Sequence, residues 1–339
     1  MTRRLATVGC AIALLAAACG DDSSAPATST TTTTSTVAED PSTTSEAPPT
    51  TSVAPSTTVA PAQVDGCTSE PAEMRTLVDD TRPTPATERS AELPNRTIDV
   101  WIDVPTESGP WPLLVFTHGL TGHARNHELH RTYLAEQCFV VIAPAFPLTN
   151  EDVPGGFLNV GDIEGQVGDV SFLIDQMLTD DGFAERIDSD RIGVIGHSLG
   201  GLTTAGAVLA ADGDQRVSAA VVMSAGFGEI RDGVAVMLLH GDADATVPIA
   251  SSIGAYGFVS GRGVFVTVLG GNHVAGIVDD FAGDYTPAVH SLTGAFFAHE
   301  LDNLAQTVVE VADVDLALVS IEARTADGPL DDWADYFAS

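Results

Sequence analysis

The feature that most constrains the fold of this chain is the stretch 191–211, RIGVIGHSLGGLTTAGAVLAA. Arg191–Ile195 is rich in β-branched apolar residues, which indicates a buried strand, and the alanine-rich segment Leu199–Ala211 predicts a helix. Between them, GHSLG at 196–200 matches G-x-S-x-G, whose glycines avoid collision in a tight strand-to-helix turn. We therefore expect Ser198 to be a nucleophile at the helix N-terminus, where backbone N–H groups can stabilise an oxyanion. The alternative is a glycine-rich turn whose serine has no catalytic role.

The first segment of the chain has the pattern of a secretory signal. Residues 1–19 contain two arginines, an apolar run that is too short to span a membrane, and small residues before Cys19. The ending, Leu15-Ala-Ala-Ala-Cys19, resembles a bacterial lipoprotein signal, although Ala16 stands where leucine is preferred. We expect an exported protein that is anchored in the cell envelope by a lipid on Cys19 or, after ordinary cleavage, secreted.

A stalk and a single domain are predicted to follow the signal. Residues 20–64 consist almost entirely of Thr, Ser, Pro, Ala and acidic residues. Such a segment has too little apolar surface to offset the entropy of ordering, so it is expected to be disordered. Residues 65–339 are long enough for one α/β domain with a full core.

The charge of the chain excludes several function classes. The formal net charge is −33, and so acidic a protein is repelled by phosphate backbones, which argues against nucleic-acid binding. Every basic residue is arginine. The chain therefore has no lysine for a P-loop, a kinase site or a Schiff base, whereas serine chemistry needs none.

The order of apolar runs predicts a doubly wound, mostly parallel sheet with helices on both faces and no large lid. Helices are expected at about 126–137 and at 162–179, and 65–94 is expected to be irregular. Strands are expected at 96–104, 111–117, 138–143, 217–223, 234–240 and 263–269, besides the strand before Ser198. Ligands bind at the carboxyl ends of such strands, where all candidate site residues fall.

Two further residues complete a candidate catalytic set. An activated serine needs a base, and the base needs an acid that orients it. Asp244 follows the strand at 234–240 and His273 follows the strand at 263–269, which gives the chain order Ser, Asp, His of α/β-hydrolases. Asp242 is the alternative acid, because its side chain could instead orient the loop through an Asx turn.

These motifs resemble those of the serine α/β-hydrolases, and within them the exported esterases and lipases that include dienelactone-hydrolase-like, platelet-activating-factor-acetylhydrolase-like and polyester-hydrolase enzymes. The resemblance covers about 95–300 and rests on VFTHGLTG at 115–122, IGHSLGG at 195–201, LHGDADATVP at 239–248 and GGNH at 270–273. It implies that Asp244 is the catalytic acid. It also implies an oxyanion hole built from the backbone N–H groups of Leu120 and Leu199.

The remaining histidines are not expected to act as base or as metal ligands. His118 and His197 are placed to shape the site, and His290 and His299 fall in a C-terminal helix. His123, His127 and His130 recur at i, i+4 and i+7, but three successive helical turns rarely converge on one ion, and H-E-x-x-H is missing. We expect a polar helix face, no metal and no cofactor.

Pocket and disulfide residues are less constrained by the sequence. Phe146 and Phe227 lie at the correct edge of the predicted sheet and, with His197, are candidates for a substrate pocket, although each phenylalanine could equally belong to the core. Cys67 and Cys138 are the cysteine pair of the predicted domain, and an exported protein permits a disulfide between them. Two buried thiols are the alternative.

The sequence therefore predicts an exported serine hydrolase that cleaves small-molecule, lipid or polymer carboxylic esters through an acyl-enzyme. The same residues would also suit amide or thioester hydrolysis or acyl transfer. A non-catalytic envelope-binding protein on a hydrolase scaffold is a third reading. The substrate and the oligomeric state are not determined by the sequence.

Overall fold

The computed structural model describes residues 66–87, 90–153, 158–209, 213–301 and 314–338. The predicted signal with Cys19 and the predicted stalk at 20–64 lie outside the described residues. Within the described ranges, no helix has the length and apolar character needed to cross a membrane.

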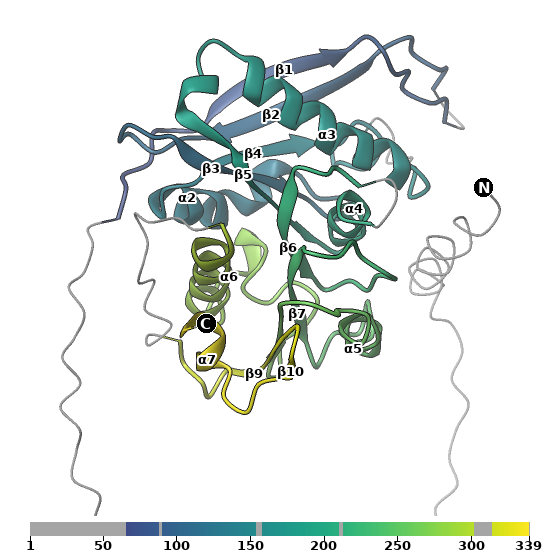
Figure 1. The fold of residues 1–339 in the computed structure, drawn as a ribbon. Helices are drawn as coiled ribbons and strands as arrows, with labels where there is room; N and C mark the ends of the chain where they lie inside the picture. The colour runs from purple at the N-terminus through teal and green to yellow at the C-terminus, as the bar shows by residue number, and fades with distance from the viewer. Residues whose placement is uncertain (1–65, 88–89, 154–157, 210–212, 302–313, 339) are drawn as a thin grey trace, which may run out of the picture.

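One ten-stranded sheet runs through the described part of the chain, in the order β1-β2-β4-β3-β5-β6-β7-β8-β9-β10 (Figure 1). From β4 to β8 in this order, neighbouring strands are parallel, whereas the outer strands pair antiparallel. The strands are β1 Glu73–Asp79, β2 Arg96–Asp103, β3 Trp111–Thr117, β4 Val140–Ala145, β5 Ile187–His197, β6 Val217–Met223, β7 Ala235–Gly241, β8 Gly263–Val268, β9 Val319–Thr325 and β10 Gly328–Pro329.

Helices cover both faces of this sheet. The α-helices are α2 Glu128–Glu136, α3 Ile163–Thr179, α4 Leu199–Ala207, α5 Ala250–Tyr256, α6 Thr286–Glu300 and α7 Ala334–Ala338, and the short 3₁₀ helices are η1 Ala124–His127, η3 Ala184–Arg186 and η4 Asp279–Phe281. α2, α6 and α7 pack on one face, and α3, α4 and α5 pack on the other. This arrangement is the doubly wound α/β architecture that the sequence predicts.

The alternation of side chains along the buried strands produces the two cores. In β3, Leu114 and Phe116 join a cluster with Phe297 of α6, while Leu113 and Val115 join a second cluster with the apolar side chains of α3. Every residue of β3 after Trp111 is buried. The continuous apolar run is therefore what a central parallel strand with two covered faces requires.

Several predicted boundaries are wrong, chiefly at the edges of the sheet. The segment expected to be irregular contains β1, which pairs with β2 although most of its side chains are at least partly exposed. β9 and β10 were not expected either. Backbone hydrogen bonds hold such edge strands, so their sequences carry little hydrophobic pattern. The helix expected from Leu199 ends at Ala207, and β4 continues through Pro144 to Ala145.

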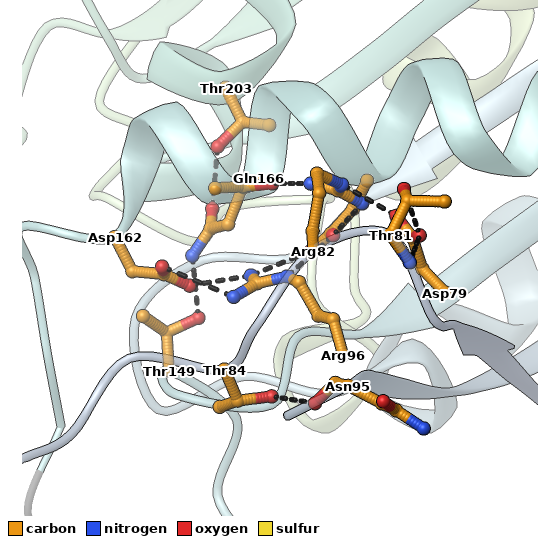
Figure 2. Close-up of polar contacts among 12 residues, drawn as sticks. Asp79, Thr81, Arg82, Thr84, Asn95, Arg96, Thr149, Asp162, Gln166 and Thr203 are labelled. Carbon is orange, nitrogen blue, oxygen red and sulfur yellow. Dashed lines mark hydrogen bonds and ion pairs between the residues drawn. The ribbon is translucent and has the colours of Figure 1, made fainter. Parts of the chain in front are cut away.

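A buried ionic cluster fixes α3 to the sheet. Arg96 at the start of β2 forms ion pairs with Asp162 and Asp169, and all of these side chains are at most 2% exposed. Arg82 forms ion pairs with Asp169 and with Asp79 (Figure 2). Burial opposes the charge on Arg96, but hydrogen bonds and attraction from the two aspartates outweigh burial and raise the pKa of Arg96. The carboxylates thus compensate the buried guanidinium.

A disulfide closes the N-terminal end of the described chain. Cys67 and Cys138 are joined, with their Cα atoms 5.2 Å apart and a sequence separation of 71. Cys138 lies just before β4. The bond therefore ties the segment that precedes β1 to the interior of the sheet.

Removing this bond is expected to destabilise the protein. A loop of this length restricts the unfolded chain, so the double variant Cys67→Ser/Cys138→Ser should lose up to about 4 kcal/mol of free energy of unfolding. Denaturant titration of the full chain without reductant measures the loss. Reductant should lower the stability of the wild type and leave the double variant unchanged. Equal stability of wild type and variant would contradict a disulfide that constrains the unfolded state.

Candidate active site

Ser198 lies in a strained turn between β5 and α4. Its φ of 55° and ψ of −117° are rarely adopted by a residue with a side chain. The turn is also crowded: a Cβ on Gly196 would collide with the Thr117 hydroxyl, and one on Gly200 would collide with the Thr117 carbonyl. The G-x-S-x-G pattern thus reflects real steric limits, and the turn is of the kind that the sequence predicts.

The side chains of Ser198, His273 and Asp244 form a continuous hydrogen-bonded chain. The Ser198 hydroxyl lies 2.9 Å from His273 Nε2, to which it can donate, and His273 Nδ1 lies 2.7 Å from Asp244 Oδ2. Each residue follows a different strand, β5, β7 or β8, at the carboxyl edge of the sheet. Residues far apart in the sequence therefore meet in the geometry that proton transfer from a serine requires.

Asp244, rather than Asp242, contacts the histidine. The Asp242 carboxylate accepts a hydrogen bond from the Gly270 backbone at 2.6 Å and so orients the neighbouring loop. Burial alone would raise the pKa of Asp244, but hydrogen bonds from His240, His273 and the Val247 backbone outweigh burial and hold this pKa well below its usual value. Asp244 is consequently ionised and can stabilise a positive charge on His273.

His240 is a site residue to which the sequence analysis assigned no role. Its fully buried ring lies between the acid loop and α5: Nε2 is 2.8 Å from the Val247 carbonyl and 3.1 Å from Asp244 Oδ2. Nδ1 is 2.6 Å from the Ser252 hydroxyl. The only sequence signal was its place as the first residue of H-G-x-x-D, at the end of β7.

His197 is buried against the His273 backbone instead of lining a pocket, which corrects the pocket prediction. It is 4% exposed, and its Nε2 donates to the backbone carbonyl of His273 at 2.7 Å. The Ser224 hydroxyl donates to the same carbonyl at 3.3 Å. Burial is the main reason that the pKa of His197 lies well below the usual value. The neutral ring therefore remains a hydrogen-bond donor to the His273 loop.

The two predicted oxyanion donors flank Ser198. The loop that carries Leu120 touches the serine, because a Cβ on Gly119 would lie 3.2 Å from Ser198 Cβ. Leu199 is the first residue of α4. In the described part of the chain, neither the Leu120 N–H nor the Leu199 N–H donates to a backbone carbonyl in a turn, loop or helix cap. Both donors are therefore available for a negatively charged oxygen near Ser198 Oγ.

His118 holds the loop that carries Leu120 through two hydrogen bonds. Its Nδ1 donates to the Gly119 carbonyl at 2.7 Å, and its Nε2 accepts from the Phe146 backbone at 3.0 Å. Burial lowers the pKa of His118 to about 3, so the ring stays neutral. Phe146 itself is completely buried and packs against the His118 ring. It belongs to the core, which corrects its assignment to the pocket, whereas Phe227 is partly exposed and remains a candidate.

Comparisons with known proteins agree with the fold. No family model matches the chain. Over 110 residues, 30% of this chain, it is 33% identical to the "Putative esterase YitV" of Bacillus subtilis (strain 168), and the match spans 40% of that protein's length. A ferulic acid esterase from Streptomyces cinnamoneus superposes with a TM-score of 0.51 and 19% identity, covering 72% of this chain and 92% of the esterase. The chain has an α/β-hydrolase fold.

The histidines of η1 and α2 have separate protein partners. His123 accepts from the Arg125 backbone, His127 Nδ1 donates to the Ile277 carbonyl at 3.0 Å, and His130 Nε2 bonds to Thr293 at 2.7 Å. The three rings do not converge. Among the described residues, no group of three or more His, Cys, Asp or Glu is placed to hold a metal ion.

Protonation of His127 is expected to destabilise the fold. Burial lowers the pKa of His127 from 6.5 to about 4, so below pH 6.5 the unfolded chain takes up a proton that the folded chain excludes. This stability is present above that pH and is lost as the pH falls. His127→Gln keeps a donor to Ile277 without the titration. Between pH 7 and pH 4 the wild type should lose about 3 kcal/mol more free energy of unfolding than the variant.

Denaturant titrations of both proteins at the two pH values measure this difference. The remaining buried histidines titrate in both proteins, so their effects cancel in the comparison. If the two proteins lose stability in parallel, His127 is not a buried neutral imidazole.

Proposed function

We propose that this protein is a serine carboxylic-ester hydrolase in which Ser198 is the nucleophile, His273 the base and Asp244 the acid. The observation that carries the proposal is the hydrogen-bonded chain from Ser198 through His273 to Asp244 at a strained strand-to-helix turn. The similarity of part of the chain to a protein named as an esterase supports ester hydrolysis over other acyl-group chemistry.

The reaction would proceed through an acyl-enzyme. Ser198 Oγ attacks the ester carbonyl carbon while His273 Nε2 takes the hydroxyl proton, and the carbonyl π electrons move to the oxygen held by the Leu120 and Leu199 N–H groups. Collapse expels the alcohol, which takes the proton from His273. Water then attacks the acyl carbon, gives a proton to His273, and the departing Ser198 Oγ recovers it. Asp244 stabilises the charged His273 in both halves.

The same proposal covers the substrate class and the location. We propose a small-molecule, lipid or polymer ester as substrate, because the segment 224–234 between β6 and β7 contains no helix that would cover the site. The subgroup is that of the exported esterases and lipases. The protein would reach the cell envelope or the medium through the signal at 1–19, and Cys19 and the stalk would tether the domain to the membrane. The chemistry requires no metal or cofactor.

Hydrolysis of p-nitrophenyl acetate, butyrate and longer esters by the full chain tests this function. Ser198→Ala should lower kcat/KM by about 10,000-fold or more, because the acyl-enzyme cannot form. Ser260→Ala, an exposed serine in the loop before β8, is the matched control and should keep wild-type activity. Equal rates for wild type and Ser198→Ala would refute the proposal. Loss of all ester hydrolysis while a fluorophosphonate still labels Ser198 would move the assignment to amide, thioester or acyl-transfer chemistry.

A pair of aspartate variants tests the assignment of the acid. Asp244→Asn should lower kcat by about 10,000-fold, because the amide no longer selects the His273 tautomer or stabilises its charge. Asp242→Asn keeps an oxygen that can accept from the Gly270 backbone and should cost less than about tenfold. The same ester assay measures both. A larger loss in Asp242→Asn than in Asp244→Asn would reverse the assignment.

A further inference from the structure

Gln166 is a buried polar residue that the proposed mechanism does not use. It lies in α3, and its side chain is completely buried. The amide makes two side-chain hydrogen bonds in opposite directions (Figure 2): Oε1 accepts from the Thr203 hydroxyl at 2.6 Å, and Nε2 donates to the Thr149 hydroxyl at 2.8 Å. A buried amide without these hydrogen bonds would cost free energy, so the amide stays bonded to both threonines. We call the linked side chains of Thr149, Gln166 and Thr203 the bridge.

One end of the bridge lies in α4, the helix that carries the Leu199 N–H, one of the two proposed oxyanion donors. Thr203 lies in α4, one turn after Leu199, and is fully buried. Its hydroxyl, besides donating to Gln166, lies 3.3 Å from the Leu199 carbonyl. A shift of Gln166 would therefore act on the first turn of α4, which carries the Leu199 N–H.

The other end of the bridge, Thr149, contacts the loop that carries the Leu120 N–H, the other proposed donor. The Thr149 carbonyl accepts a hydrogen bond from the Thr121 N–H at 2.9 Å, and the Glu151 N–H donates to the Gly122 carbonyl at 3.1 Å. The segment at 149–151 thus holds the turn that follows Leu120. Thr149, like Gln166, is completely buried.

The ionic cluster on α3 fixes Gln166 itself. Asp162 and Asp169 lie four residues before and three residues after Gln166, so all three occupy one helix face. Arg96 holds both aspartates, and Arg82 donates to the Gly165 carbonyl at 3.0 Å (Figure 2). These contacts fix the position of Gln166 relative to β2.

We propose that Gln166 is a positioning residue that sets the separation of the two oxyanion donors, the N–H groups of Leu120 and Leu199. The inference rests on the proposed esterase function. Such donors must lie within hydrogen-bond distance of an oxygen that becomes fully charged only in the transition state. Displacement of either donor consequently lowers kcat, while binding of the uncharged ester changes little.

Four variants of the full chain test this proposal. Gln166→Met fills a similar volume without hydrogen bonds, while Thr149→Val and Thr203→Val each remove one end of the bridge. Thr84→Val is the matched control. Thr84 is also buried, and its hydroxyl donates to the Asn95 carbonyl at 2.8 Å, in contact with neither oxyanion segment (Figure 2).

The three bridge variants should lower kcat by about 10- to 100-fold and leave KM within about threefold. A boronic acid, which forms a tetrahedral adduct with the serine, should lose affinity by the same factor. The double variant Thr149→Val/Thr203→Val should lose no more than the worse single variant, because either change already breaks the bridge. Thr84→Val should alter the denaturation midpoint alone.

Other outcomes would overturn the inference. If the bridge variants keep the wild-type kcat, Gln166 is only a packing residue. The same holds if Thr84→Val lowers kcat and boronic-acid affinity as much as the bridge variants do. It also holds if the losses of the two single variants multiply in the double variant. If Gln166→Met does not fold, the two threonine variants decide the matter. A wild type without ester hydrolysis would refute the esterase function and not the role of Gln166. The bridge variants would then be tested by the rate at which a fluorophosphonate labels Ser198, which should fall in these variants.

Discussion

The site depends on one strained residue held between two packed elements. Ser198 has a positive φ, a conformation that costs about 1–3 kcal/mol and persists only where the surroundings enforce it. The Ser198 N–H is fixed to the Met223 carbonyl at 2.9 Å, which continues the pairing of β5 with β6. The chain must therefore turn sharply to enter α4. The missing side chains at Gly196 and Gly200 make that turn possible, because a Cβ on either residue would collide with Thr117.

Around this turn, buried histidines position the loops that carry the other proposed roles. His118 binds the carbonyl of Gly119 in the oxyanion loop, His197 binds the carbonyl of the base, and His240 binds the carbonyl of Val247 in the acid loop. An imidazole suits this task because it is rigid and offers a donor and an acceptor on opposite sides of one ring. The histidine count of the sequence thus reflects support of the loops more than catalysis.

Local sequence patterns predicted the buried strands, whereas contacts between residues distant in the sequence could not be predicted. β3 and β6 have the predicted bounds, since buried strands show continuous apolar runs, and the positions of Ser198, Asp244 and His273 follow from turn motifs with strict steric needs. The sequence analysis expected a helix at 162–179 but assigned no role to its polar residues Gln166 and Asp169. Their buried partners are distant in the sequence, Thr149 and Thr203 for Gln166 and Arg96 for Asp169, and no local pattern reveals such partners. The sequence left Phe146 open between pocket and core, because position at a sheet edge does not determine burial.

The disulfide also determines how a mechanical load would enter the domain. Cys138 precedes β4, at the amino edge of the parallel strands, whereas Ser198 lies at their carboxyl edge. The six residues of β4 separate these edges by about 20 Å. Tension on the chain ahead of Gly66 would pass through the cysteine bridge to the residues just before β4, the third strand of the sheet, and would bypass the weakly buried β1. The load would therefore enter the sheet at the edge opposite Ser198.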